Sequence, residues 1–348
     1  MKQQNKHRQN WTRRVFLILA GICFLFPLPV YAQEGMLNYN VTPVFPQSQN
    51  DDNESYFDLR LDPGGKETIS LKLQNVRQEP IELAVTVHTA FTNVMGVVEY
   101  GENAEEKDPT LTHTLSELIE GPDTVSLAAN ETKTVAFDLH MPKEKFEGFL
   151  AGGLRVSEIK EETEQSSEGE GAAIINEFSY VVAVLLSNSR DSISPDLELL
   201  NVFPDQLNAR NVISANLQNF QPAFLNQLAV EATIQRVGEE EILYEASQEM
   251  MQMAPNSNFN FPISLEGEPF KSGDYVLHLK ATSGSQEWTW EREFTIDADE
   301  AKALNRTDVT LDSSINWWMV GTLILLAILI GITIYKYFSK RKLSNERK

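Results

Sequence analysis

The stretch MQMAPNSNFNFPISL, from Met251 to Leu265, alternates between apolar and polar side chains with a period of two. Six large apolar residues have odd numbers, and four amide or hydroxyl residues have even numbers: Met251, Met253, Phe259, Phe261, Ile263 and Leu265, against Gln252, Asn258, Asn260 and Ser264. Side chains of a strand point alternately to the two faces of a sheet. The pattern predicts a strand ending at Met253, a break at 255–257 and a second strand from Phe259. Its odd face points into a core, and its asparagines face water or a partner.

The same alternation recurs in the first half of the chain. Three runs show it: KETISLKLQN at 66–75, PIELAVTVHTAF at 80–91 and ETKTVAFDLHMP at 131–142. Each run is bounded by turn residues and places one apolar row on one face: Ile69, Leu71 and Leu73; Ile81, Leu83, Val85 and Val87; Val135, Phe137, Leu139 and Met141. Short half-buried strands of this kind predict a β-sandwich. Residues 115–119 are the one stretch here that suggests a helical turn.

A fresh set of strand patterns begins after Ser187. About seven segments occur within roughly 100 residues, the number typical of an immunoglobulin-like sandwich. The fold class is therefore all-β, with two tandem immunoglobulin-like β-sandwiches at 33–187 and 188–298. A short polar segment, Asn188 to Ser194, joins them. Each sandwich has its own alternating core, so each is expected to fold alone.

The N-terminus has the pattern of a secretory signal peptide over residues 1–32. Five basic residues precede an apolar run from Val15 to Leu28, and Val30-Tyr31-Ala32 supplies a cleavage site. The apolar run is short for an uncleaved anchor, which is the alternative. Cys23, the only cysteine, lies within this run and is expected to leave with it, so no disulfide or thiolate site remains.

The C-terminus predicts one transmembrane helix at 317–337. This run has no charge until Lys336, tryptophans at one end and tyrosines near the other. A basic tail follows at 338–348, which places the tail in the cytoplasm and the sandwiches outside. Residues 299–316 form a polar juxtamembrane stalk, weakly helical at best. The predicted location is the plasma membrane of a Gram-positive bacterium, with the N-terminal part in the wall.

The exterior part of the chain is strongly acidic. The whole chain has a formal charge of −21, but 11 of its 29 basic residues lie in the two terminal segments. Residues 33–316 retain 18 basic and 49 acidic residues, a net charge of −31. Nucleic acid is therefore excluded as a partner, since phosphate binding needs a basic surface. Residues 157–173 form an acidic loop. Calcium capture is an alternative to a simple solvated loop, although the spacing is not that of an EF-hand.

No catalytic, metal-binding or cofactor-binding group is predicted. The mature chain has four isolated histidines without zinc-site spacing: His88, His113, His140 and His278. Ser157 and Lys160 fit the Ser-x-x-Lys pattern of penicillin-recognising enzymes. That motif requires a helix start, whereas these residues lie where a strand enters the acidic loop. The ligand-binding residues stay unassigned.

Several long runs resemble the WxL-interacting proteins of Gram-positive bacteria. They include YFDLRLDPGGKETISLKLQN from Tyr56, PKEKFEGFLAGG from Pro142 and MQMAPNSNFNFPI from Met251. The resemblance covers nearly the whole mature chain. It implies a peptidoglycan-binding first domain and a host-binding second domain. The implied partners are peptidoglycan, surface proteins with Trp-x-Leu motifs and host extracellular matrix proteins. The chain has no Trp-x-Leu motif itself, as expected for the partner of such proteins.

These observations predict a non-enzymatic surface adaptor that binds cell wall and a protein partner. Two alternatives stay open: a surface assembly chaperone, which would release its client, and a membrane-anchored cell-wall hydrolase. The absence of a nucleophile or metal motif in the sequence argues against the hydrolase.

Overall fold

The computed structural model describes residues 38–50, 55–160 and 178–311, together with 318, 321–326 and 328–332. The predicted signal peptide (1–32) lies outside these residues, as do the basic tail (338–348) and positions 161–173 of the acidic loop. Much of the predicted membrane span (317–337) also lies outside them. Both sandwiches belong to one compact unit, which begins at Tyr39.

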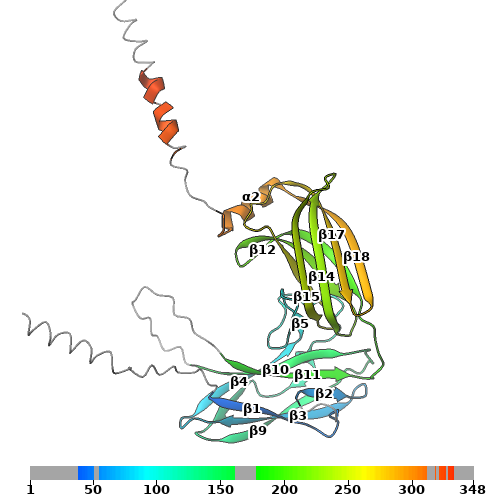
Figure 1. Cartoon of the computed structure of the whole chain (residues 1–348). Coiled ribbons are helices and arrows are strands. Elements are labelled where there is room, and N and C mark those ends of the chain that lie inside the picture. Colours follow the sequence, from blue (N-terminus) through cyan, green and yellow to red (C-terminus); the bar gives the residue numbers. More distant parts are fainter. Residues whose placement is uncertain are drawn as a thin grey trace, which may run out of the picture. The chain divides into compact units, whose positions relative to one another are not determined.

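The described residues of the first domain form eleven strands. They are β1 (Tyr39–Val44), β2 (Phe57–Arg60), β3 (Lys66–Asn75), β4 (Ile81–Thr89), β5 (Phe91–Thr92), β6 (Val98–Glu99), β7 (Ile119–Glu120), β8 (Thr124–Leu127), β9 (Thr132–His140), β10 (Leu150–Glu158) and β11 (Ser179–Ser187). One sheet has the order β1-β3-β9-β7 and the other β2-β11-β10-β4-β8, while β5 and β6 form a separate hairpin (Figure 1). The 3-10 helix η1 (Leu115–Glu117) is the helical turn that the sequence predicts.

Apolar rows from both sheets meet in the core of the first domain. Ile69, Leu71 and Leu73 of β3 are fully buried, as their alternation predicts. Val87 differs from its row in β4 and is only half-buried. The hydroxyl of Tyr39 in β1 crosses between the sheets and donates a hydrogen bond to the carbonyl of Val156 in β10 at 2.9 Å. This bond satisfies a polar group that burial would otherwise leave without water.

The second domain has the seven strands that the sequence predicts. They are β12 (Leu197–Leu207), β13 (Arg210–Asn219), β14 (Leu225–Arg236), β15 (Ile242–Met253), β16 (Ser257–Ser264), β17 (Gly273–Ser283) and β18 (Gln286–Ile296). They form two sheets with the orders β12-β13-β16 and β15-β14-β17-β18. Apolar residues of both sheets join one core that includes Ile213, Phe261 and Leu277. The all-β prediction is therefore confirmed.

The stretch 251–265 forms the end of β15, a turn and β16. All six of its odd-numbered apolar residues are buried, as predicted. Its polar face is less exposed than a solvated face would be. Asn260 is half-buried and lies opposite Asn216 of β13, whose side-chain amide donates a hydrogen bond to it at 2.7 Å. Asn256 and Asn258 are half-buried as well, because the first domain covers them.

Residues after the second domain depart from the predicted stalk. Helix α2 (Ala298–Thr307) packs on the second domain, with Ala301 buried in its core. The side chain of Asn305 accepts a hydrogen bond from the backbone N–H of Phe270 at 2.8 Å and donates one to its carbonyl at 2.9 Å. The prediction of little helix in this stretch is therefore wrong for 298–307. Most residues of this helix are polar, and a few residues, such as Ala301 and Asn305, make its contacts with the second domain.

Asp308 closes the end of α2. It is buried and accepts hydrogen bonds from the backbone N–H of Asn211 at 2.7 Å and from the Thr310 hydroxyl at 2.5 Å. Burial alone would raise the pKa of this carboxyl. Hydrogen bonds from Thr310 and from the backbone of Asn211 outweigh that effect and lower the pKa. The ionised form is therefore the one that the fold favours.

In the part of the chain that the structure describes, no helix is both long enough and apolar enough to cross a membrane.

Replacing Phe261 by alanine should lower the free energy of unfolding by about 3–5 kcal/mol, because it removes a fully buried ring from the core. Replacing Asn260 by alanine should lower the free energy of unfolding by only about 1 kcal/mol, because it removes one hydrogen bond on the half-buried face. Urea denaturation of both variants measures the difference. Equal losses would show that the odd and even faces are wrongly assigned.

Replacing Asp308 by asparagine should lower the free energy of unfolding by about 1.5 kcal/mol at pH 7, because three hydrogen-bond donors lose a charged acceptor. The stabilisation by ionised Asp308 is present above the unfolded pKa of about 3.9. It is lost as the pH falls through the lower folded pKa. Thermal melts from pH 7 to pH 2 should therefore show the parent and the variant converging. The exposed Asp299 of α2 provides a control variant, Asp299→Asn, and an equal loss there would refute the role of Asp308.

Candidate binding surface at the junction of the two domains

The β5–β6 hairpin of the first domain lies against β15 and β16 of the second domain (Figure 1). The hydroxyl of Thr92 shares a buried hydrogen bond with the Ser257 hydroxyl at 2.7 Å. It also accepts a hydrogen bond from the backbone N–H of Ala254 at 3.0 Å. The turn between the two halves of the opening stretch is therefore a contact site for the first domain.

A buried carboxylate provides the second set of contacts across the junction. Asp108 of the first domain is 5% exposed. Its two oxygens each lie 3.0 Å from the side-chain amide nitrogen of Gln218, and one lies 2.6 Å from that of Asn258. The hydroxyl and backbone N–H of Thr110 also donate to Asp108. A buried charge needs such donors, because water no longer solvates it.

Two glycines allow the domains to approach closely. Gly96, at the tip of the β5–β6 hairpin, has no room for a Cβ atom, which would lie 2.4 Å from the sulfur of Met251. Gly148 has a φ of +66°, and a Cβ there would lie 2.1 Å from the carbonyl oxygen of Pro222. The next residue, Phe149, donates its backbone N–H to the same carbonyl at 2.8 Å. Side chains at either glycine would therefore push the domains apart.

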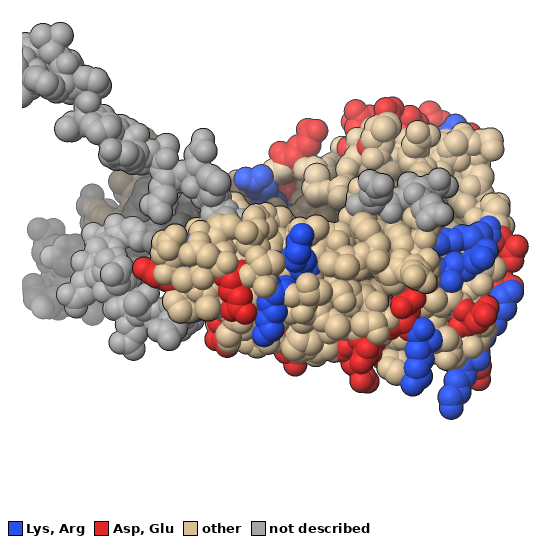
Figure 2. All heavy atoms as spheres, turned by 90° about the horizontal axis from the view of Figure 1, so that it is seen from below, with Lys and Arg blue, Asp and Glu red and all other residues tan. Residues whose placement is uncertain are grey.

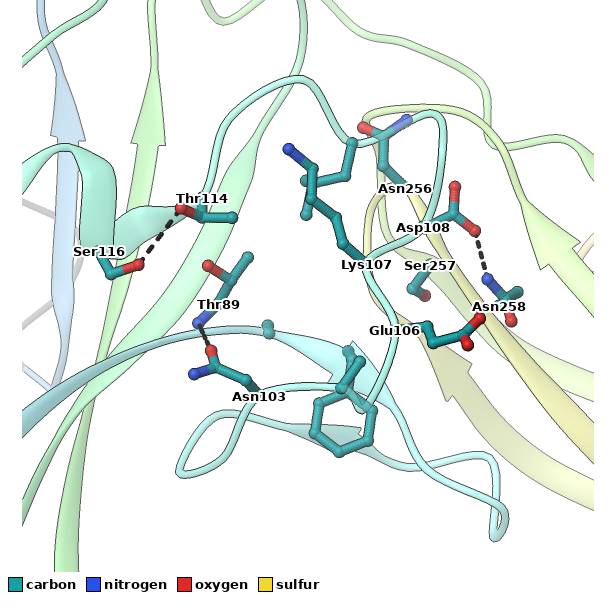
Figure 3. A pocket seen from close by; sticks show the side chains of 14 residues that line it. Thr89, Asn103, Glu106, Lys107, Asp108, Thr114, Ser116, Asn256, Ser257 and Asn258 are labelled. Carbon is teal, nitrogen blue, oxygen red and sulfur yellow. Dashed lines mark hydrogen bonds between the residues drawn. The ribbon is translucent and has the colours of Figure 1, made fainter.

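A small polar pocket of about 160 Å³ lies beside Asp108 (Figure 3). Both domains line it, the first with Lys107 and Asp108 and the second with Asn256, Ser257 and Asn258. Hydroxyl groups of Thr89, Thr114 and Ser116 complete the polar lining. The lining therefore contains hydrogen-bond donors and acceptors, and both basic and acidic side chains. The volume of the pocket is below the 300–1,000 Å³ that is typical of small-ligand sites.

Two larger hollows continue along the same junction. A hollow of about 460 Å³ shares Leu111 and Asn256 with the small pocket. A further hollow of about 450 Å³ shares Phe149 with the second one. Because neighbouring hollows share lining residues, they form a row along the junction. Such a row suits an extended ligand better than a compact one.

The histidines that the sequence singles out do not gather at this junction. Three of them lie on separate strands: His88 on β4, His140 at the end of β9 and His278 on β17. His278 Nδ1 lies 3.7 Å from a carboxylate oxygen of Glu291. His88 Nε2 lies 2.7 Å from the Thr86 hydroxyl, and burial, followed by the nearby charge of Arg155, lowers the pKa of this histidine. Only His113 lines one of the hollows.

Ser157 lies in β10 and pairs with Ser179 of β11, so the Ser-x-x-Lys pattern begins near the end of a strand and not at a helix start, and Lys160 follows the strand. Within the described ranges, no group of three or more histidine, cysteine or acidic side chains is placed to hold a metal ion. The calcium alternative for the acidic loop concerns residues that are largely outside those ranges.

Charges of both signs mix on the surface of the described residues. On the face shown in Figure 2, basic and acidic side chains lie side by side around a broad uncharged area. Elsewhere among the described residues, oppositely charged side chains form ion pairs, such as Arg77 with Glu158 at 2.7 Å and Arg190 with the buried Asp58 at 2.5 Å. The acidity of the sequence is therefore not gathered on this face.

Both domains match models of one protein family. Residues 39–158 match the peptidoglycan binding domain of the WxL Interacting Protein, and residues 169–306 match its host binding domain. The chain belongs to the WxL-interacting protein family. The resemblance seen in the sequence is confirmed, and the two domains occur in the predicted order. Both matched domains are described as binding domains, which supports a surface adaptor and a non-enzymatic role.

Curated proteins gave no match to the chain. Solved structures gave weak similarities to pilus chaperones. The class 5 fimbriae chaperone CfaA is 11% identical, with a TM-score of 0.30 over 73% of this chain and 99% of that chain. A chain of the CsuC–CsuE chaperone–tip adhesion subunit complex of Acinetobacter baumannii is 13% identical, with a TM-score of 0.30 over 73% and 98%. The PapD-like domain 7 of human CEP192 is 10% identical, with a TM-score of 0.27 over 48% and 99%. TM-scores this low do not establish a shared function.

Sequence reasoning left the binding residues of this WxL-interacting protein unassigned, and it also did not find the residues of the junction. The junction brings together Asp108, Gly148, Gln218 and Asn258, which are far apart in the sequence. The one signal available in the sequence was the amide-rich face of 251–265, which was predicted to face either water or a binding partner. Part of that face contacts the first domain of the same chain.

Replacing Asp108 by asparagine should weaken the junction by about 1.5–3 kcal/mol, because an amide cannot accept hydrogen bonds from both Gln218 and Asn258 at full strength. Denaturation of the whole chain measures the loss. Proteolysis within 188–194 should become faster as the domains separate. The exposed neighbour Glu105 provides the control, and Glu105→Gln should stay within about 0.5 kcal/mol of the parent. An unchanged Asp108→Asn protein would show that this carboxylate does not hold the domains together.

Proposed function

We propose that this WxL-interacting protein is a non-enzymatic adaptor at the surface of a Gram-positive bacterium. It binds peptidoglycan through its first domain and a surface protein with a Trp-x-Leu domain through its remaining surface. The observation that carries this proposal is the presence of both matched binding domains in one chain. Host extracellular matrix proteins form a second class of ligand for the second domain.

The junction supports an adaptor that holds two ligands at once. Buried hydrogen bonds at Thr92 and Asp108 join the domains, so their binding surfaces keep a fixed geometry. Two attachments on one body gain avidity, because the first contact raises the effective concentration for the second. Individually weak contacts are then sufficient to retain a partner at the wall.

The proposed location follows from the two ends of the sequence. The signal peptide at 1–32 exports the chain, and the apolar span at 317–337 retains it in the plasma membrane. The basic tail at 338–348 stays in the cytoplasm. The membrane provides a third attachment, which keeps the adaptor at the inner side of the wall.

Attraction to teichoic acid does not account for wall binding in this proposal. The exterior part of the chain has a net charge of −31 and would repel that polyanion. Binding should therefore depend on uncharged groups of the wall. It should also tolerate salt, because screening weakens only charge-dependent contacts.

Purified whole protein should sediment with peptidoglycan that has been stripped of teichoic acid, and it should do so at moderate salt. A Trp-x-Leu-domain protein should co-sediment only when this protein is added, because the adaptor forms the bridge. Boiled membranes that contain no peptidoglycan are the control for the sedimenting material. An unrelated acidic protein is the control for the adaptor.

Three results would contradict the adaptor. A supernatant that retains all of the protein would refute wall binding. Release of muropeptides during incubation would support the hydrolase alternative. Dissociation of the Trp-x-Leu-domain protein as soon as the complex reaches the wall would support the assembly chaperone.

A further inference from the structure

The hollow of about 450 Å³ at the junction has an unusual lining for a protein surface. Four aromatic side chains surround it: Tyr56, Tyr100, Phe149 and Phe224. Two amide side chains, Asn226 and Gln252, lie in the same lining and are hydrogen-bonded to each other. None of the described residues that line this hollow is charged. Its volume falls within the range of small-ligand sites.

Small residues also line the hollow, among them Ala151 of β10 and Ala183 of β11. Next to them, a Cβ atom on Gly153 would lie 2.7 Å from the carbonyl oxygen of Tyr100. The absence of that Cβ lets the segment that carries Tyr100 lie directly over the sheet. A carboxylate oxygen of Glu99 fixes this segment, because it accepts hydrogen bonds from the backbone N–H groups of Tyr100 and Gly101, both at 3.1 Å.

The aromatic side chains are held in place. Tyr100 and Phe224 pack against a small apolar cluster at the junction that includes Ala151 and Ala254. The guanidinium carbon of Arg190 lies 5.8 Å from the centre of the Phe149 ring. Burial, followed by the nearby Tyr56, raises the pKa of Tyr100, so its hydroxyl keeps its proton and is able to donate a hydrogen bond. Rings that are already fixed lose little entropy when a ligand binds.

We propose that this hollow binds the glycan strand of peptidoglycan, and that the second domain contributes part of the site. The inference rests on the proposed peptidoglycan binding and names its residues. The C–H faces of sugar rings pack on aromatic rings, while their hydroxyl and N-acetyl groups exchange hydrogen bonds with amide side chains.

The uncharged lining favours the neutral components of the wall over the charged ones. The N-acetylated sugar backbone is neutral, whereas teichoic acid carries phosphates and the peptide stems carry charged groups. A neutral hollow suits the sugar backbone, since burying a charge without a partner is costly. Phe224, Asn226 and Gln252 lie outside the region that matches the peptidoglycan-binding domain. The glycan site therefore extends into the domain that is described as host-binding.

The test uses the purified whole protein and peptide-free glycan strands, prepared by amidase treatment of peptidoglycan. Calorimetry should detect binding to these strands. Tyr56→Ala and Asn226→Ala should each weaken it about tenfold, equivalent to roughly 1.4 kcal/mol. Both side chains are partly or largely exposed, so both variants should keep the parental Tm. Tyr56→Phe should bind nearly as well as the parent, because it keeps the ring. Phe178→Ala removes an exposed aromatic residue outside the hollow and should leave binding unchanged.

Failure of this inference differs from failure of the adaptor. If the protein sediments with whole peptidoglycan but ignores peptide-free strands, the glycan assignment is wrong and wall binding stands. The same holds if Tyr56→Ala and Asn226→Ala bind the strands as the parent does. If the two variants instead lose capture of the Trp-x-Leu-domain protein, the hollow is a protein-docking site. If the parent binds no form of peptidoglycan, both proposals fall.

Discussion

The buried carboxylate of Asp108 is the contact on which the arrangement of the two domains depends. Its oxygens accept hydrogen bonds from Gln218 and Asn258 of the second domain, and its own domain supplies only Thr110. If the junction opened only partly, the Asp108 carboxylate would lose hydrogen-bond donors of the second domain while water could not yet replace them. Such a state is costly in free energy. The junction therefore favours a fully closed state. The hollows along it exist in that state, because both domains line them.

Most of the fold was predictable because its strands alternate cleanly. The run at 66–75 coincides with β3, and the six apolar residues of 251–265 are all buried. Helix α2 was missed for a physical reason. It buries little more than Ala301. The side chains of Asn305 and of Asp308, which follows the helix, hold it by accepting hydrogen bonds from the distant backbone N–H groups of Phe270 and Asn211. A pattern of local hydrophobicity contains no information about such long-range polar contacts.

The candidate site was beyond prediction from one sequence. Its aromatic residues come from four separate segments, at positions 56, 100, 149 and 224, where each is an ordinary residue of its own segment. Asp108 is one of 50 acidic residues, most of which are solvated charges. Only the folded structure shows that Asp108 is one of the few that are buried. Composition did exclude nucleic acid, and the family resemblance indicated a wall ligand, but neither assigned a residue.

A closed junction and a bound glycan should stabilise each other. The seven-residue segment at 188–194 is bound to the first domain at Asn188 and Arg190. Without further contacts, its remaining residues would still allow the domains to separate. The contacts at Thr92, Asp108 and Gly148 oppose that separation and thereby assemble the hollow before any ligand arrives. Coupling of this kind is reciprocal, so a ligand that contacts Tyr56 and Asn226 together must in turn oppose separation. In such an adaptor, binding to the wall also stabilises the closed arrangement of the two domains. Two independent domains on a flexible linker would gain only a higher effective concentration for the second ligand.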